Sequence, residues 1–327
     1  MVSDHSDVVH EAAETVERGE PIGVGLAHGL SRVPDREVEQ LTRLADRARR
    51  RCSENRVDLC AIISARSGRC SEDCSFCAQS DHHDGAAPVF GMKSVTEIVE
   101  AAVKAEEQGA RRFCTVTSGD ELGDEDFSTV LEAVAAIKER TDLGRCASVG
   151  SLDGARARQL KEAGLDRYHH NLETARSHFG AVCSTHSYED RLATIGCLDG
   201  AGIEKCVGGI LNLGETPAQR IQFAFELAAI NPVSVPINFL NPRRGTPLEH
   251  QEMIKASEAA KYLAIFKLVL PASSLRLAGG RAETFVNDQA MPFRAGVSAL
   301  LIGDLLTTQG PDVDQDLALL GSLGFDH

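Results

Sequence analysis

A repeated unit constrains the fold of this 327-residue chain more than any other feature. From Val57 onward, a short apolar or β-branched run is followed by a loop, an amphipathic helical pattern, a glycine and the next run. Strands that alternate with helices pair in parallel through right-handed crossovers, and about eight such units over about 250 residues match a (β/α)8 barrel. We therefore predict an α/β fold of the TIM barrel type, with a doubly wound open sheet as the alternative.

Local signals support the predicted order of strands and helices. Residues 94–97 and 216–219 have the sequence of helix N-terminal caps, and four glycines stand where a helix must end. These glycines are Gly109, Gly164, Gly202 and Gly296. The predicted strands are residues 58–65, 112–117, 145–151, 167–172, 205–213, 234–240, 274–278 and 299–303.

The segment before the first strand has a different pattern. Val38, Leu41, Ala45 and Ala48 recur at helical spacing within a charged background. We predict that residues 1–56 form an N-terminal helical extension and that residues 57–327 form the barrel domain.

Composition limits the partners and the location of the protein. The formal net charge of −14 argues against binding to nucleic acid or to an anionic membrane, because both require clustered Lys and Arg. Residues 1–7 have no basic segment followed by an apolar one, so we expect a cytoplasmic protein. Ten cysteines in such a chain point to metal binding or catalysis before disulfides.

Three of the cysteines, Cys70, Cys74 and Cys77, lie in one short loop after the first predicted strand. A structural zinc site is closed by four protein ligands, so His82 or His83 would have to complete one here. A 4Fe-4S cluster held by three cysteines instead keeps one iron without a protein ligand, and that iron can chelate a small molecule.

The C-x3-C-x2-C spacing, with Phe76 just before the last cysteine, resembles the radical S-adenosylmethionine superfamily. The resemblance implies that the open iron of a 4Fe-4S cluster holds S-adenosylmethionine, which the reduced cluster cleaves to a 5′-deoxyadenosyl radical. Cys70, Cys74 and Cys77 are then both metal ligands and catalytic residues, and Phe76 belongs to the cofactor site.

Four more residues fall on separate predicted strands. Cys114 lies in the second, Cys146 in the third, Cys206 in the fifth and Arg276 in the seventh. If their side chains point inward, they converge on the barrel axis. A single buried cysteine is often only a small apolar residue, but a buried arginine without an anionic partner is costly.

Beyond Val57 the chain resembles the biotin synthase family along most of its length. The segments that carry the match are residues 64–77, 112–114, 168–173, 206–216, 234–238, 245–247, 275–281 and 305–308. The resemblance implies that Cys114, Cys146, Cys206 and Arg276 ligate an auxiliary 2Fe-2S cluster, whose sulfide is inserted into dethiobiotin to give biotin. This reaction is the last step of biotin biosynthesis.

The same resemblance implies roles for polar residues. Asn171 matches a residue that contacts both S-adenosylmethionine and the ureido group of the substrate, and Glu173 matches the carboxylate that holds the ribose hydroxyls. Ile210 matches an apolar position beside adenine. Asn238 and His169 are assigned to the substrate pocket, although Asn238 is equally compatible with a turn residue at a strand end.

Some residues depart from the family pattern. They are Asn212, Glu173, His169 and residues 117–121. Cys52, Cys60, Cys183 and Cys197 match no ligand position and are interpreted as structural. The family further implies a homodimer and an electron donor of the flavodoxin or ferredoxin type. The alternatives are another radical barrel enzyme, of the hydrogenase-maturation or methylornithine-synthase type, and a zinc-binding scaffold protein.

Overall fold

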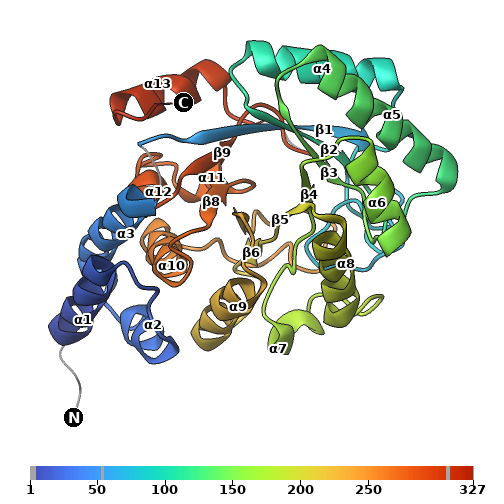
Figure 1. Ribbon diagram of the computed structural model, residues 1–327. Coiled ribbons are helices and arrows are strands. Elements are labelled where there is room, and N and C mark those ends of the chain that lie inside the picture. The colour runs from blue at the N-terminus through green and yellow to red at the C-terminus, as the bar shows by residue number, and fades with distance from the viewer. Residues whose placement is uncertain (1–4, 53–54, 307–309, 327) are drawn as a thin grey trace.

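The described part of the chain forms one closed ring of parallel strands surrounded by helices (Figure 1). The structure is a computed structural model that describes residues 5–52, 55–306 and 310–326. The sheet order is β5-β4-β3-β2-β1-β9-β8-β7-β6, and a further pairing of β5 with β7 closes the ring. The strands are β1 (Asp58–Arg66), β2 (Arg112–Thr117), β3 (Gly144–Ser148), β4 (Arg167–His169), β5 (Glu204–Cys206), β6 (Gly209–Leu211), β7 (Ser234–Phe239), β8 (Ser274–Leu277) and β9 (Ala299–Leu301). The predicted TIM-type barrel is confirmed, and the open sheet is excluded.

One predicted strand, residues 205–213, is split into β5 and β6, which occupy the same position in the barrel. Cys206 pairs with Ser234 of β7 and Gly209 pairs with Ile237, so both pieces keep one register. Pro236 lies opposite the gap and has no N–H to donate, which interrupts the ladder. Gly208 also approaches Pro236 so closely that an added Cβ would lie 1.9 Å from its carbonyl oxygen.

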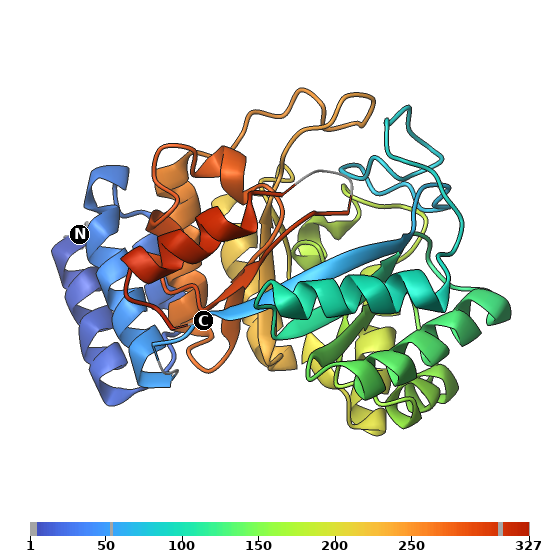
Figure 2. The ribbon, with the colours of Figure 1, turned by 90° about the horizontal axis from the view of Figure 1, so that it is seen from above.

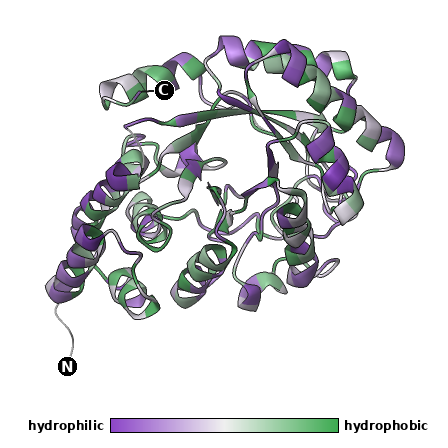
Figure 3. Ribbon diagram, viewed as in Figure 1, coloured by the Kyte–Doolittle hydropathy of each residue, from purple (hydrophilic) through white to green (hydrophobic). Residues whose placement is uncertain are grey.

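Helices cover the outside of the barrel, and Figure 3 shows them with mixed hydrophobic and hydrophilic surfaces, as expected for helices with one face on the core. The predicted caps are confirmed, since Ser94 and Thr216 each form a capping box. All four predicted glycines have positive φ. The helices after β1 are α4 (Val95–Glu107), α5 (Asp124–Arg140), α6 (Gly154–Glu162), α7 (Arg176–Phe179), α8 (Tyr188–Ala201), α9 (Pro217–Ile230), α10 (Ala256–Val269), α11 (Arg281–Thr284), α12 (Met291–Arg294) and α13 (Val313–Ser322).

The segment before β1 is helical, as predicted. It contains α1 (His5–Arg18), α2 (Val24–Ser31), the short 3-10 helix η1 (Asp35–Glu37) and α3 (Val38–Cys52). Leu41, Leu44 and Ala45 of α3 are buried, and α3 packs against α10 on the outside of the barrel (Figure 1). The extension therefore shares a core with the barrel, and its treatment as a separate domain stays a prediction. Among the described residues, no helix is both long and apolar enough to span a membrane.

Long loops extend from one end of the barrel, the end where the parallel strands finish (Figure 2). Two of them are residues 67–94, after β1, and residues 240–255, after β7. They pack together, since the backbone at Gly245 lies against the carbonyl of Asp84. In parallel barrels the active site forms at this end, so the loops and strand ends here define where to look.

Candidate active site

A cavity of about 440 Å³ opens at the carboxyl ends of the strands. All the predicted site residues except Cys206 line it, drawn from the loop after β1, from the strands and from the loops that follow them. The lining residues are Cys70, Cys74, Phe76, Cys77, Cys114, Cys146, His169, Asn171, Glu173, Ile210, Asn238 and Arg276. Cys206 is fully buried behind the wall, in contact with two of the lining residues, His169 and Arg276.

The three-cysteine loop leaves β1 through two residues with positive φ, Gly68 and Arg69. Backbone hydrogen bonds then fold the loop back on itself: the N–H of Cys70 donates to Gln79 O at 3.0 Å, and the N–H of Cys77 donates to Cys74 O at 2.9 Å. All three thiols are free and turn toward the cavity wall. In the zinc alternative, His82 or His83 would add a fourth ligand to the three thiols. Their ring nitrogens instead contact the carbonyls of Ser71 and Cys74.

Cys183, which the sequence analysis treated as structural, lies beside Cys74. The two sulfur atoms and a ring nitrogen of His186 are all within 4.8 Å of one another. A hydrogen bond from Cys74 lowers the pKa of Cys183 to about 6, and the same bond raises the pKa of Cys74. No spacing rule could have found this contact, because it joins the loop after β1 to the segment between α7 and α8.

The strand residues predicted for a second centre come together inside the barrel. Cys114 and Cys146 are register partners on the neighbouring strands β2 and β3. Cys206 of β5 and Arg276 of β8 lie on the two strands that flank β7. Each is at most 4% exposed. The hydrogen bond from Cys114 lowers the pKa of Cys146 to about 6 and raises the pKa of Cys114. The strands therefore supply three buried thiols, from three different positions in the ring.

Arg276 has few partners for a buried guanidinium. Nη1 lies 3.9 Å from Cys206 Sγ, and Nη2 donates to Asp58 Oδ2 at 3.3 Å. Nε has no hydrogen-bond partner among the described residues. Burial opposes the charge, but the sulfur atoms of Cys60 and Cys206 and the Asp58 carboxylate together raise the pKa of Arg276.

Cys60 is a second cysteine that the sequence analysis interpreted as structural. It lies on β1, is 1% exposed and lines the same cavity as Cys114 and Cys146. Burial raises its pKa to about 12, although the charge of Arg276 acts in the opposite direction. The alternation of side chains along β1 could have indicated that Cys60 faces the cavity. Cys60 and Ile62 lie on one face of the strand, and both line the cavity.

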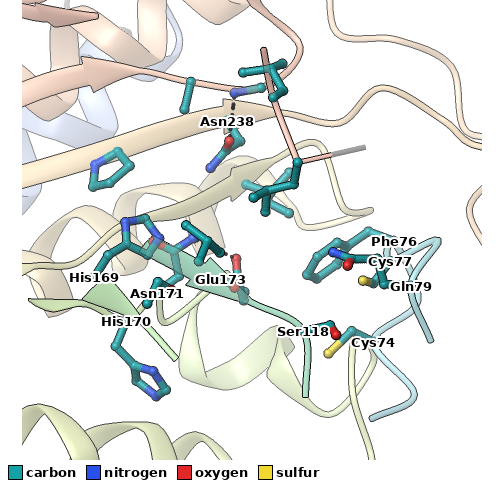
Figure 4. A pocket seen from close by; sticks show the side chains of 18 of the residues that line it. Cys74, Phe76, Cys77, Gln79, Ser118, His169, His170, Asn171, Glu173 and Asn238 are labelled. Atoms are coloured by element: carbon teal, nitrogen blue, oxygen red, sulfur yellow. Dashed lines mark hydrogen bonds between the residues drawn. The ribbon is translucent and has the colours of Figure 1, made fainter. Parts of the chain in front are cut away.

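Asn171 and Glu173 lie where β4 leads into the next loop, and Figure 4 shows both beside the cavity. Asn171 Oδ1 accepts from the N–H of Gly208 at 3.2 Å, and its Nδ2 donates to Glu173 Oε2 at 3.3 Å. Glu173 has a φ of 67°, a left-handed conformation that is unusual for a residue with a side chain. This backbone position carries strain at the point where the carboxylate enters the cavity.

The amide of Asn238 connects neighbouring strands. Its Nδ2 donates to Gly209 O at 3.1 Å, and its Oδ1 accepts from the N–H of Gly279 at 2.8 Å (Figure 4). Nδ2 can donate one more hydrogen bond and Oδ1 can accept one more, so the side chain can still bind a ligand. These two contacts also give Asn238 a structural role, because they link Gly209 to Gly279. The alternative prediction of a turn residue at a strand end did not include this link.

His169, the last residue of β4, and His170, which follows it, point in different directions (Figure 4). His169 Nδ1 lies 3.5 Å from Cys206 Sγ. Burial opposes protonation of His169, but the nearby sulfur atoms of Cys206 and Cys146 raise its pKa. Burial lowers the pKa of His170, whose Nε2 has no partner among the described residues.

Both sets of cysteines, the three in the loop and the three on the strands, fit iron-sulfur clusters. Soft thiolates are the ligands that such clusters take, and every one of these cysteines is free. In the barrel, the unpaired Nε of Arg276 and its long contact with Cys206 leave this guanidinium able to face a further group.

Two family models match this chain. Residues 65–227 match the Radical SAM superfamily, and residues 236–326 match the Biotin and Thiamin Synthesis associated domain. The biotin synthase of Pelotomaculum thermopropionicum is 43% identical over 96% of this chain and 98% of its own length. The biotin synthase of Desulforudis audaxviator is 44% identical over 98% and 97%.

Solved structures share the fold at much lower identity. Methylornithine synthase superposes with a TM-score of 0.83 at 19% identity, over 96% of both chains. The FeFe-hydrogenase maturase HydG from Carboxydothermus hydrogenoformans gives a TM-score of 0.81 at 18% identity, over 98% of this chain and 79% of its own. These two likenesses show the fold alone, whereas the relatives above match in sequence over at least 96% of this chain and of their own length. The chain therefore belongs to the biotin synthase family of radical S-adenosylmethionine enzymes.

Proposed function

We propose that this protein converts dethiobiotin to biotin and that the three barrel cysteines and Arg276 hold a 2Fe-2S cluster that donates the sulfur. The observation that carries the proposal is the convergence of Cys114, Cys146, Cys206 and Arg276 from four strands, within the same cavity region that the three-cysteine loop faces. Sulfur insertion needs a sulfur source beside the radical-generating centre, and this second set of thiols offers a place to hold one.

The substrate explains why two centres are required. The carbons of dethiobiotin that receive sulfur are a methyl and a methylene, which offer neither an acidic proton nor a leaving group to acid, base or nucleophile catalysis. When bound, the 4Fe-4S cluster with S-adenosylmethionine supplies a hydrogen-abstracting radical, and the 2Fe-2S cluster supplies sulfur. The protein contributes position and the exclusion of water.

Residues of the loop and of β6 would bind the 4Fe-4S cluster and S-adenosylmethionine. Cys70, Cys74 and Cys77 would bind the 4Fe-4S cluster, and Phe76 and Ile210 would form the apolar wall beside S-adenosylmethionine. Both of these side chains pack against the buried cluster of Val182, Leu213 and Leu240, which fixes their position.

Polar residues would orient the two organic molecules. Glu173 would accept hydrogen bonds from the ribose hydroxyls, and Asn171 lies next to it, fixed by Gly208 on the other side. Asn238 and His169 line the space between the two thiol sets, where the substrate must lie if it is to reach both. Closure of this space by the loops protects a reactive carbon from solvent.

Partners follow from the same chemistry. The enzyme acts on a small molecule, and reduction of the 4Fe-4S cluster requires an electron donor, for which a flavodoxin or ferredoxin is proposed. A homodimer and a cytoplasmic location complete the proposal, and the family is their only support.

The direct test is an anaerobic assay of the reconstituted protein with dethiobiotin, S-adenosylmethionine and a reductant. Biotin and 5′-deoxyadenosine should both appear, and omission of dethiobiotin should remove biotin while leaving slow S-adenosylmethionine cleavage. Formation of 5′-deoxyadenosine without any biotin, from protein shown to contain both clusters, would overturn the proposed substrate.

A further inference from the structure

Cys183 is given no part in the proposed sulfur insertion, yet it lies beside Cys74. Cys74 Sγ, Cys183 Sγ and a ring nitrogen of His186 lie within 4.8 Å of one another, and both cysteines are free and buried. We propose that Cys183 is the disulfide partner of Cys74: after oxidative loss of the 4Fe-4S cluster, the two form a disulfide that keeps Cys74 recoverable. The proposed function neither requires nor predicts this step.

The backbones on both sides of the cysteine pair are fixed to each other. The N–H of Ser75 donates to Val182 O at 2.8 Å. Asp73 Oδ1 accepts from the N–H of Ser184 at 2.8 Å and from the N–H of Thr185 at 3.3 Å. Backbone separation is the usual obstacle to a disulfide, and these contacts hold the two segments side by side at the cysteine pair.

The two sulfur atoms are enclosed to a similar degree, since Cys74 is 8% exposed and Cys183 is 6% exposed. Cys74 lines the cavity, so a small oxidant such as hydrogen peroxide that enters the cavity reaches this pair. Oxidation of either sulfur leaves the other beside it, where a resolving thiol must lie.

The chemistry balances in two steps. One sulfur of the pair attacks hydrogen peroxide, the O–O bond breaks, and sulfenic acid and one water form. The other sulfur attacks the sulfenic sulfur, the S–S bond forms as the S–O bond breaks, and hydroxide leaves with the proton of the attacking thiol as the second water. Two thiols lose two electrons to one peroxide, and no other oxidant is needed. A thiol reductant reverses the disulfide but cannot reverse oxidation to sulfinic acid.

Mass spectrometry of the full-length protein tests the bond itself. Reconstituted protein is treated with hydrogen peroxide until the cluster absorbance is lost, then alkylated and digested with trypsin, which yields peptides 70–93 and 177–191. We expect these peptides to be cross-linked in the wild type and in Cys70→Ser, and to be separate in Cys74→Ser and Cys183→Ser. A disulfide confined to peptide 70–93 in the wild type would overturn the proposal, whatever the folding of the variants.

Recovery of iron is the second readout. After peroxide, reduction and renewed reconstitution, the wild type should regain its 4Fe-4S iron, and Cys183→Ser should regain about fivefold less because Cys74 is over-oxidised. Cys197→Ser, which changes a partly buried cysteine on α8, is the matched control and should recover like the wild type. Equal recovery in Cys183→Ser would contradict protection. Neither readout uses dethiobiotin, so the result is independent of the proposed reaction.

Discussion

At the scale of single residues, the two cysteine sets differ in what holds them. Cys70, Cys74 and Cys77 depend on loop hydrogen bonds and two left-handed residues, whereas Cys114 and Cys146 are fixed by strand register. The motif spacing was enough to predict the first set. The second was predictable only through the resemblance, because a buried cysteine in a strand looks the same whether it binds metal or fills space.

Substitutions in the two sets should separate two activities. Cys74→Ala removes a ligand of the 4Fe-4S cluster and is expected to abolish cleavage of S-adenosylmethionine. Cys146→Ala leaves the loop intact, so cleavage should continue while biotin is not made. The measurement is 5′-deoxyadenosine and biotin from the same anaerobic reaction, and equal loss of both products in both variants would contradict the division of labour.

The ion pair that orients Arg276 gives a second prediction at this scale. Asp58→Asn removes the carboxylate 3.3 Å from Nη2 while keeping the side-chain shape. We expect the visible spectrum of the 2Fe-2S cluster to change and that of the 4Fe-4S cluster to stay the same. Because Asp58 is 33% exposed, the loss in unfolding free energy should be small, about 1 kcal/mol. An unchanged 2Fe-2S spectrum would show that Asp58 does not position the arginine.

At the scale of elements, local pattern predicted most strands within a few residues. The bounds of β2 were exact, since its apolar run is flanked by Arg111 and by the polar residues from Ser118 on. The division of β5 from β6 could not be predicted, although Pro236 was visible, because its consequence depends on which strand it faces. The Cys74–Cys183 contact was hidden for the same reason: it arises from how two loops meet at the barrel end.

The end of α10 provides a prediction about pH. Lys267 is 1% exposed, and its Nζ donates to Pro271 O at 2.9 Å and Ser273 O at 3.0 Å, which ties α10 to the start of β8. Burial lowers its pKa from 10.5 to about 8. The folded state thus disfavours the charged amine, which lowers the free energy of unfolding. This destabilisation is complete below about pH 8 and absent above about pH 10.5.

The stability of the wild type relative to Lys267→Met should therefore rise as pH increases from 8 to 10.5, by on the order of 3 kcal/mol in total. Urea unfolding of both proteins, free of clusters and under reductant, at several pH values measures this difference. The Met variant controls for cysteine ionisation, which both proteins share. A difference that stays constant with pH would mean that Lys267 titrates normally.

At the scale of the whole molecule, the barrel brings the two sets of thiols to one cavity region while building them from separate parts of the chain. One depends on a surface loop and the other on strands whose positions are set by the whole ring. The repeated units predicted this ring, and the ring in turn explains why residues as far apart as Cys114 and Arg276 can share a site. Chain order alone gives no such proximity.

Because the centres are built separately, iron should be lost from them independently. The wild type should hold about six irons per chain with matching sulfide after reconstitution, and Cys206→Ala should hold about four. Cys77→Ala should conversely keep about two, because the strands that carry the auxiliary site do not depend on the loop. Iron and acid-labile sulfide analysis measures these values. Simultaneous loss of all iron from either variant would show that the two centres assemble as one unit, and tight zinc in place of iron would contradict both.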